Sequence, residues 1–215
     1  MKSIKIKMIL LMLGNGLGVM AILVAVTFFS INTYSNRLIQ NITDTIFSDY
    51  DANVKSQVDN VISLLETIYS YQKQNSLSDE EGKRIAANYI RGLKYGESGY
   101  FFADDYEGIN YVNPPDPSTE GKSRIALKDF NGKELIREII ENGRKEGGGF
   151  TEYWYPKPGQ TKADRKRTYS RAFEPYRWVI GTGNYVDDLD KLVQQKRNEN
   201  REYFRYLAIT ILVIL

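Results

Sequence analysis

The sequence predicts an α+β domain with one antiparallel sheet of about five strands, built on a long N-terminal helix and flanked by transmembrane helices. Three observations lead to this prediction. Apolar runs stand at both ends of the 215-residue chain. A stripe of helical period, free of Pro and Gly, follows the first run. Short aromatic runs separated by Gly- and Pro-rich turns come next, which is typical of antiparallel strands.

The first apolar run, 8–31, holds 24 residues and no charge. A helix of this length can cross a bilayer core of about 30 Å. Three lysines, Lys2, Lys5 and Lys7, precede the run, and positive residues mark the cytoplasmic flank. We therefore expect residues 1–7 in the cytoplasm and an uncleaved transmembrane helix over 8–31. A cleaved signal peptide is the alternative, although the run is long for one and shows no clear cleavage site.

The second apolar run starts at residue 204 and stops with the chain at 215. Its 12 residues would reach about 18 Å as a helix, which is too short to cross a bilayer. We expect 204–215 to be the truncated start of a second transmembrane helix that leads to a cytoplasmic output domain. The range 32–203 is then an extracytoplasmic, periplasmic domain held at the inner cell membrane.

The composition excludes several kinds of function. The chain has no Cys and no His, which removes thiolate zinc sites, cysteine nucleophiles and serine triads built on His. Setting aside Lys2, Lys5, Lys7 and Arg205 leaves 25 basic and 27 acidic residues, a net charge of −2. Such a domain has no basic footprint for nucleic acid. No nucleophile–base pair is recognisable either, so we expect no enzyme, no cofactor and no metal.

A long helix is expected over 32–74, where apolar residues recur every three or four positions. The stripe consists of Ile42, Ile46, Tyr50, Val54, Val58, Val61, Leu65 and Ile68. A helix of about 60 Å cannot be buried in a small domain along its whole length, so we expect it to pair with the last helix and with a second subunit. Ser78, followed by Asp79, Glu80 and Glu81, predicts the capped start of a second helix.

The strands alternate with two further helices. We expect strands at 99–104, 109–112, 150–155, 167–173 and 177–183, a helix after Asn131-Gly132, and a final helix from Val186 onward. Side chains two positions apart share one face of a strand. One face of 167–173 carries Arg167, Tyr169, Arg171 and Phe173, and the other carries Thr168, Ser170 and Ala172. Aromatic rings around a cation can bind a small anion, but periodicity alone favours ordinary core packing with arginines at the sheet edge.

Several motifs then occur in a fixed order. They are Gly99-Tyr100-Phe101-Phe102, Asn113-Pro114 with Gly121-Lys122, Asp129-Phe130-Asn131-Gly132-Lys133, Gly148-Gly149-Phe150 with Glu152-Tyr153, Pro156-Lys157-Pro158-Gly159, and Trp178-Val179-Ile180-Gly181-Thr182-Gly183 with Tyr185 and Asp187-Asp188. Over about residues 35–200 this order resembles the single Cache sensor domain of bacterial chemoreceptors, sensor kinases and cyclases.

The resemblance implies a PAS-like sheet outside the membrane, a homodimer, and a pocket for small metabolites, often short carboxylates such as acetate, propionate, pyruvate or lactate. It also implies that binding shifts the final helix. One position departs from the pattern, because many members carry His where this chain has Asn113 before Pro114. Asn can donate and accept hydrogen bonds, but it stays uncharged, so the ligand preference is open.

Our hypothesis is a sensor for a small organic anion, with Arg171 as a bidentate carboxylate clamp. The other candidate ligand residues are Tyr169, Tyr153 and Tyr111 as polar tips, Phe102, Tyr100 and Trp178 as walls, and Asn113 and Lys122 as loop contacts. The alternative is a membrane-anchored module for dimerisation or partner docking without a small-molecule ligand. A collapsed sheet pocket and an exposed apolar patch would favour that alternative.

Overall fold

The computed structural model describes residues 2–96, 99–157 and 159–214. The predicted ranges 1–7 and 204–215 each include one residue outside this part. The chain divides into two compact units. We call Phe47–Leu189 the sheet unit, and Met1–Ile46 with Asp190–Leu215 the helical unit. Helices α1 (Lys2–Gln74) and α4 (Val186–Ile214) each contribute residues to both units.

The helical unit contains the apolar part of α1. Among the described residues, one helix is long and apolar enough to cross a membrane, α1 over Ile4–Gln74, and no residue of its most apolar stretch is buried. Within this unit α1 also contacts α4. The rings of Tyr34 and Phe204 meet edge to face at 6.0 Å, and Asn200 donates a 3.1 Å hydrogen bond to Ser35. The predicted pairing of the long helix with the last helix is confirmed.

The sheet unit holds a five-stranded antiparallel sheet in the order β4-β3-β7-β6-β5, as predicted. The strands are β3 (Phe102–Asp105), β4 (Asn110–Val112), β5 (Gly149–Pro156), β6 (Ala163–Phe173) and β7 (Trp178–Tyr185). A separate small pair, β1 (Lys94–Tyr95) and β2 (Gly99–Tyr100), precedes β3, so the expected strand 99–104 is interrupted. The connection between β5 and β6 is also shorter than expected, because β6 begins at Ala163.

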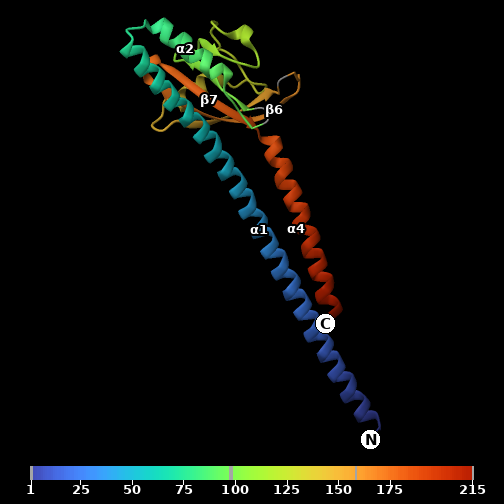
Figure 1. Cartoon of the computed structure of the whole chain (residues 1–215). Helices are drawn as coiled ribbons and strands as arrows, with labels where there is room; N and C mark the ends of the chain where they lie inside the picture. The colour runs from blue at the N-terminus through green and yellow to red at the C-terminus, as the bar shows by residue number, and fades with distance from the viewer. Residues whose placement is uncertain (1, 97–98, 158, 215) are drawn as a thin grey trace. The chain divides into compact units, whose positions relative to one another are not determined.

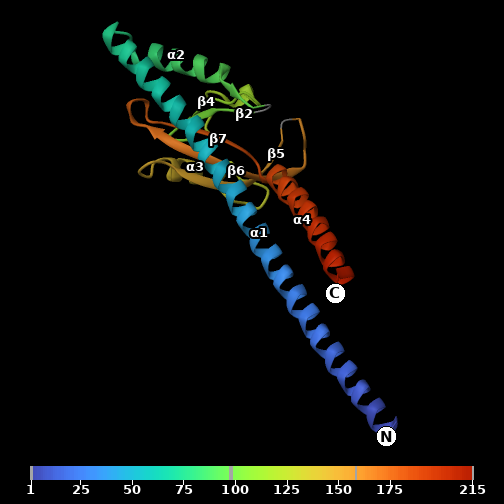
Figure 2. The same cartoon turned by 60° about the horizontal axis from the view of Figure 1, so that its bottom comes forward.

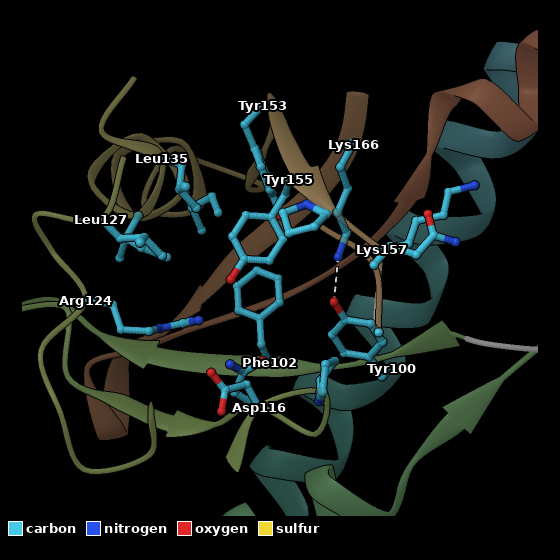
Figure 3. A pocket seen from close by; sticks show the side chains of 17 residues that line it. Tyr100, Phe102, Asp116, Arg124, Leu127, Leu135, Tyr153, Tyr155, Lys157 and Lys166 are labelled. Carbon is cyan, nitrogen blue, oxygen red and sulfur yellow. Dashed lines mark hydrogen bonds between the residues drawn. The ribbon is translucent and has the colours of Figure 1, made fainter. Parts of the chain in front are cut away.

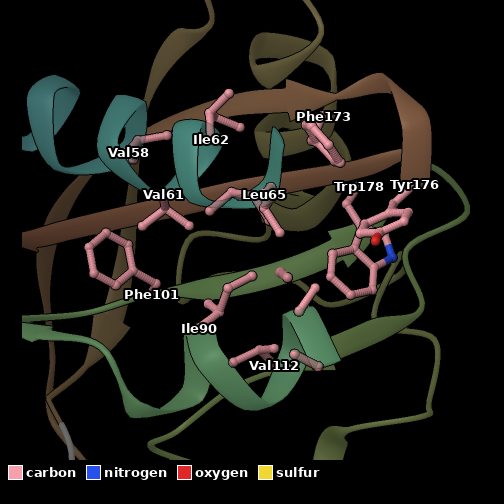
Figure 4. Close-up of a cluster of buried hydrophobic side chains, with 14 of the residues drawn as sticks. Val58, Val61, Ile62, Leu65, Ile90, Phe101, Val112, Phe173, Tyr176 and Trp178 are labelled. Atoms are coloured by element: carbon pink, nitrogen blue, oxygen red, sulfur yellow. The ribbon is translucent and has the colours of Figure 1, made fainter. Parts of the chain in front are cut away.

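Helices cover both faces of this sheet (Figures 1 and 2). One face packs on α1 and α2 (Asp79–Gly92), and the other packs on α3 (Leu135–Gly143). Figure 4 shows the first core, a cluster of buried side chains that includes Val58 and Leu65 of α1, Ile90 of α2 and Trp178 of β7. The predicted stripe from Tyr50 to Ile68 is buried here, since helical spacing places those side chains on one side of α1.

The start of α2 is fixed by its cap. The Ser78 hydroxyl accepts from the backbone N–H of Glu81, and the Glu81 carboxylate accepts from the backbone N–H of Ser78. This reciprocal pair satisfies two donors that a helix end leaves free. The predicted N-cap is confirmed, and it fixes α2 on the first core, where Ile90 is fully buried.

Candidate functional site

A cavity of about 180 Å³ lies on the face of the sheet that α3 covers. Strands supply its floor, α3 supplies an apolar wall, and two connections close its rim (Figure 3). The connections are residues 113–127 and the turn between β5 and β6. Drug-sized ligands occupy about 300–1,000 Å³, so this cavity suits a smaller molecule.

Lys166 of β6 places a buried cation in the cavity. It is 2% exposed, and its Nζ donates a 2.7 Å hydrogen bond to the Tyr100 hydroxyl (Figure 3). The same Nζ lies 4.6 Å from the ring centre of Tyr100 and 5.3 Å from that of Tyr185. Aromatic faces attract cations. Within the described part of the chain no carboxylate forms an ion pair with Lys166.

The polar surroundings of Lys166 raise the pKa of its amine. Burial acts to lower the pKa of its amine, but the oxygens of Tyr153, Tyr100 and Tyr185 outweigh burial, and the pKa lies above its ordinary value. A buried charge is costly unless it is paired. A cavity that keeps such a cation without a carboxylate is therefore suited to an anion from solution.

Arg124 lines the cavity from the connection after β4. Its Nη2 lies 2.6 Å from Oδ2 of Asp104, and its Nε and Nη2 both donate to Oδ1 at 3.1 and 2.8 Å. Asp104 is fully buried and also accepts from Asn110 at 3.1 Å. Burial raises the pKa of Asp104, although Arg124 and Asn110 act in the opposite direction. This ion pair fixes the guanidinium and balances its charge.

The other surfaces of the cavity are aromatic and aliphatic. Phe102 forms part of the floor, and it can lie close to the sheet because its neighbour on β7 is Gly181, where a Cβ would collide with the ring. Tyr153 is buried, and its hydroxyl bonds Thr168 Oγ1 at 2.9 Å. The apolar wall consists of Leu127, Leu135, Ile136 and Ile139. A ligand here would meet a cation on one side and hydrocarbon on another.

Four predicted ligand residues line this cavity. They are Tyr100, Phe102, Asn113 and Tyr153. Asn113 is buried and held in place, because its Nδ2 donates to Thr119 Oγ1 at 2.9 Å and its backbone N–H donates to Glu120. A role for these four in ligand contact stays a prediction.

The predicted clamp lies on the other face of the sheet. Arg171 Nη1 is 2.6 Å from Asp59 of α1, and Tyr169 is buried in the core between the sheet and α1. The alternation along β6 was right, but the face with Arg171 and Tyr169 packs on the long helix. Neither residue lines the cavity, so we do not place the carboxylate clamp at Arg171.

Three further predicted residues also lie elsewhere. The ring centres of Tyr111 and Trp178 lie 4.7 Å apart with their planes tilted by 42°, and Trp178 is fully buried in the core beneath α1 and α2. Both occupy strand positions whose side chains point away from α3. Lys122 is exposed in the connection after β4 and is not among the lining residues. We therefore remove Tyr111, Trp178 and Lys122 from the candidate site.

Two cations of the cavity, Lys166 and Arg124, were not predicted from the sequence. Lys166 was assigned to a loop because the strand was expected to begin at 167. If the strand had been started one residue earlier, alternation would have placed Lys166 on the same face as Thr168 and Ser170. Arg124 had no local signal, since its partner Asp104 lies 20 residues away.

The fold and the cavity define a small-ligand-binding domain on a PAS-like sheet. The chain belongs to the Single Cache domain 2 family, whose model matches residues 46–199. The domain is therefore a Cache sensor domain of the type found in chemoreceptors and sensor kinases.

One curated relative is the sensor histidine kinase MctS of Rhizobium johnstonii, which is 31% identical over 173 residues. The match covers 80% of this chain and 36% of that protein, so the chain spans about a third of the length of this relative.

Two solved structures share the fold. A periplasmic sensor domain of a chemotaxis protein is 31% identical with a TM-score of 0.62, and the match covers 65% of this chain and 97% of that one. A Cache chemosensory domain solved to explain carboxylic acid recognition is 25% identical, also with a TM-score of 0.62, and the match covers 66% of this chain and 97% of that one.

Proposed function

We propose that this chain is the extracytoplasmic sensing region of a transmembrane signalling receptor, and that its cavity binds a small organic anion such as a short carboxylate without transforming it. The observation that carries the proposal is Lys166, a cation that is 2% exposed in a cavity and forms no ion pair within the described residues. The solved Cache chemosensory domain that recognises a carboxylic acid supports the same ligand class.

The charges around the cavity favour a ligand with one negative charge. Arg124 is balanced by Asp104 at 2.6 Å, and Lys157 at the rim is paired with Asp187 at 2.9 Å. Asp116 also lines the cavity, but its side chain is at the exposed mouth and accepts from Ser118. Lys166 therefore leaves one unbalanced positive charge in the buried part. Arg124 can still donate hydrogen bonds to an uncharged oxygen of the ligand.

The apolar wall favours a short hydrocarbon part in the same ligand. Leu127 and Leu135 lie on the opposite side of the cavity from Lys166 (Figure 3). A monocarboxylate of a few carbon atoms would place its charge at Lys166 and its chain against these leucines. Burying that chain contributes about 0.8 kcal/mol per CH₂ group.

The membrane arrangement completes the proposal. The apolar part of α1 would anchor the receptor in the inner membrane with its N-terminus in the cytoplasm, and α4 would carry the signal towards a cytoplasmic output domain. A homodimer is part of the same expectation. The alternative of a docking module without a ligand expected a collapsed sheet pocket, and an open cavity of about 180 Å³ argues against it.

A thermal-shift screen tests the proposal. The full chain in detergent micelles is heated with acetate, propionate, pyruvate, L-lactate or succinate. An anion at 100 times its dissociation constant should stabilise the fold by about 2.7 kcal/mol, which raises the midpoint visibly. We expect at least one monocarboxylate to do so and succinate to do so less. A well-folded chain that none of the five anions stabilises would contradict the proposal.

A further inference from the structure

A lysine at the rim of the cavity also contacts the first turn of α4. Lys157 follows β5 and lines the cavity. Its Nζ lies 2.9 Å from Oδ2 of Asp187, the second residue of α4. Asp187 is not one of the residues that line the cavity. One ammonium group therefore lies between the place where a ligand would bind and the helix that leads out of the sheet unit.

Tyr185 connects the two lysines of the cavity to the same helix. It is the last residue of β7 and directly precedes α4. Its ring centre lies 5.2 Å from Nζ of Lys157 and 5.3 Å from Nζ of Lys166. Its hydroxyl donates a 2.6 Å hydrogen bond to the carbonyl of Pro156, the residue before Lys157. The Tyr185 ring thus contacts both Lys157 at the rim and the buried Lys166, and its residue directly precedes α4.

The geometry around Lys157 allows two anionic partners. Both side chains of the Lys157–Asp187 pair are partly buried, at 20% and 32% exposure, so the pair is screened less than one in open water. A carboxylate in the cavity would lie beside Lys166 and on the same side as Lys157. Two acceptors that compete for one cation are linked, because a gain for one weakens the other by the same factor.

We propose that Lys157 couples occupancy of the cavity to α4 by exchanging its partner. It pairs with Asp187 when no anion is bound, and it turns to the anion when one is bound, which releases a tether on the first turn of α4. This inference rests on the proposed function, since it needs an anion in the cavity. It adds a coupling residue, Lys157, and identifies Asp187 as its intramolecular competitor.

The tether is tested first, without any anion, by hydrogen–deuterium exchange on the full chain in detergent micelles. Asp187→Asn and Lys157→Met should each speed exchange of backbone amides in 159–164 and 186–189 by about threefold or more, the scale of a partly exposed ion pair. Asp187→Glu keeps the charge, and Lys162→Met changes an exposed lysine of the same connection. Both controls should exchange like the wild type. Unchanged exchange in Asp187→Asn would overturn the tether.

The competition is tested with propionate by isothermal titration calorimetry on the same variants. Asp187→Asn should bind propionate about threefold more tightly, because a competitor is removed, and Lys157→Met about threefold more weakly. If Asp187→Asn binds propionate as tightly as the wild type or more weakly, the proposal that Lys157 exchanges Asp187 for the anion is overturned. If the wild type binds none of the five anions of the screen, the proposed function fails and the competition fails with it. The hydrogen–deuterium exchange experiment decides separately whether Lys157 at the rim is tethered to α4.

Discussion

The ammonium group of Lys166 lies 2.7 Å from the hydroxyl oxygen of Tyr100. Lys166 belongs to β6 and Tyr100 to β2, so the contact joins two strands that are far apart in the sequence. This contact turns a fully buried lysine towards the cavity instead of towards solvent. Under the proposed function, this one buried group would give a domain of near-zero net charge its preference for an anion.

Replacing Arg171 should leave anion binding intact. Arg171 pairs with Asp59 on the face of the sheet that contacts α1, so Arg171→Ala should bind an anion of the screen with an affinity within about twofold of the wild type. The pair is about a third exposed, and its loss should lower the free energy of unfolding by less than about 1 kcal/mol. Calorimetric titration measures the affinity. Loss of anion binding by Arg171→Ala would contradict this prediction and would place Arg171 in the ligand site.

Breaking the pair between Asp104 and Arg124 should be strongly destabilising. Asp104→Ala leaves the Arg124 guanidinium buried without its carboxylate, which costs about 3–5 kcal/mol. Urea unfolding followed by Trp fluorescence measures the change. Asp116→Ala, at the exposed mouth, serves as the control and should change little. The double variant Asp104→Leu with Arg124→Met should be more stable than Asp104→Ala, and a double variant that is less stable would contradict this account.

Asp129 should contribute stability that depends on pH. Although burial opposes ionisation, hydrogen bonds from the backbone N–H groups of Trp154, Lys133 and Asn131 hold the pKa of Asp129 below its ordinary value. A carboxyl whose pKa is lower in the folded state stabilises the fold above its unfolded pKa of about 3.9, and this contribution is lost as the pH falls towards the folded pKa.

Asp129→Asn should therefore lower the free energy of unfolding at pH 7 by about 1–2 kcal/mol, because the amide would place an NH₂ group against one of the donors. The difference between wild type and variant should shrink between about pH 5 and pH 3. Denaturant titrations across this range check the prediction. A difference that stays constant with pH would show that ionisation of Asp129 plays no part.

Gly181 should be needed for the shape of the cavity. A Cβ at this position would meet the Phe102 ring, so Gly181→Ala should push the ring into the cavity, weaken anion binding and cost about 1–3 kcal/mol of stability. Gly92→Ala is a matched control, since a Cβ there meets nothing within 4 Å. A Gly181→Ala variant that binds and unfolds like the wild type would contradict the assigned floor.

The elements of the fold could be predicted from the sequence because each has a local signal. The stripe from Tyr50 to Ile68 gave the long helix, Ser78 with Glu81 gave the cap of α2, and alternating aromatic runs gave the strands. The helical period and the capping box act over a few residues, so tertiary context did not override them. The strand boundaries were predicted less accurately, and the start of β6 was placed four residues late, at Arg167.

That boundary decided the prediction of the site. Alternation shows which side chains share a face, but it does not show which face meets which helix. The arginine-bearing face of β6 was expected to bind ligand, whereas it packs on α1 through Asp51 and Asp59. Two ion pairs join residues that are distant in the sequence: Arg124 and Asp104 are 20 positions apart, and Lys157 and Asp187 are 30 positions apart. No local sequence pattern therefore indicates them.

The most direct test of the account is calorimetric titration of propionate into the full chain and into Lys166→Met, with Lys162→Met as the control. We expect Lys166→Met to bind at least about 10- to 100-fold more weakly, the scale of a lost charge-assisted hydrogen bond. It should also remain as stable as the wild type or become more stable, because an unpaired buried charge is replaced by an apolar side chain of similar length. Binding by Lys166→Met with wild-type affinity would contradict the central claim that this buried cation receives the ligand.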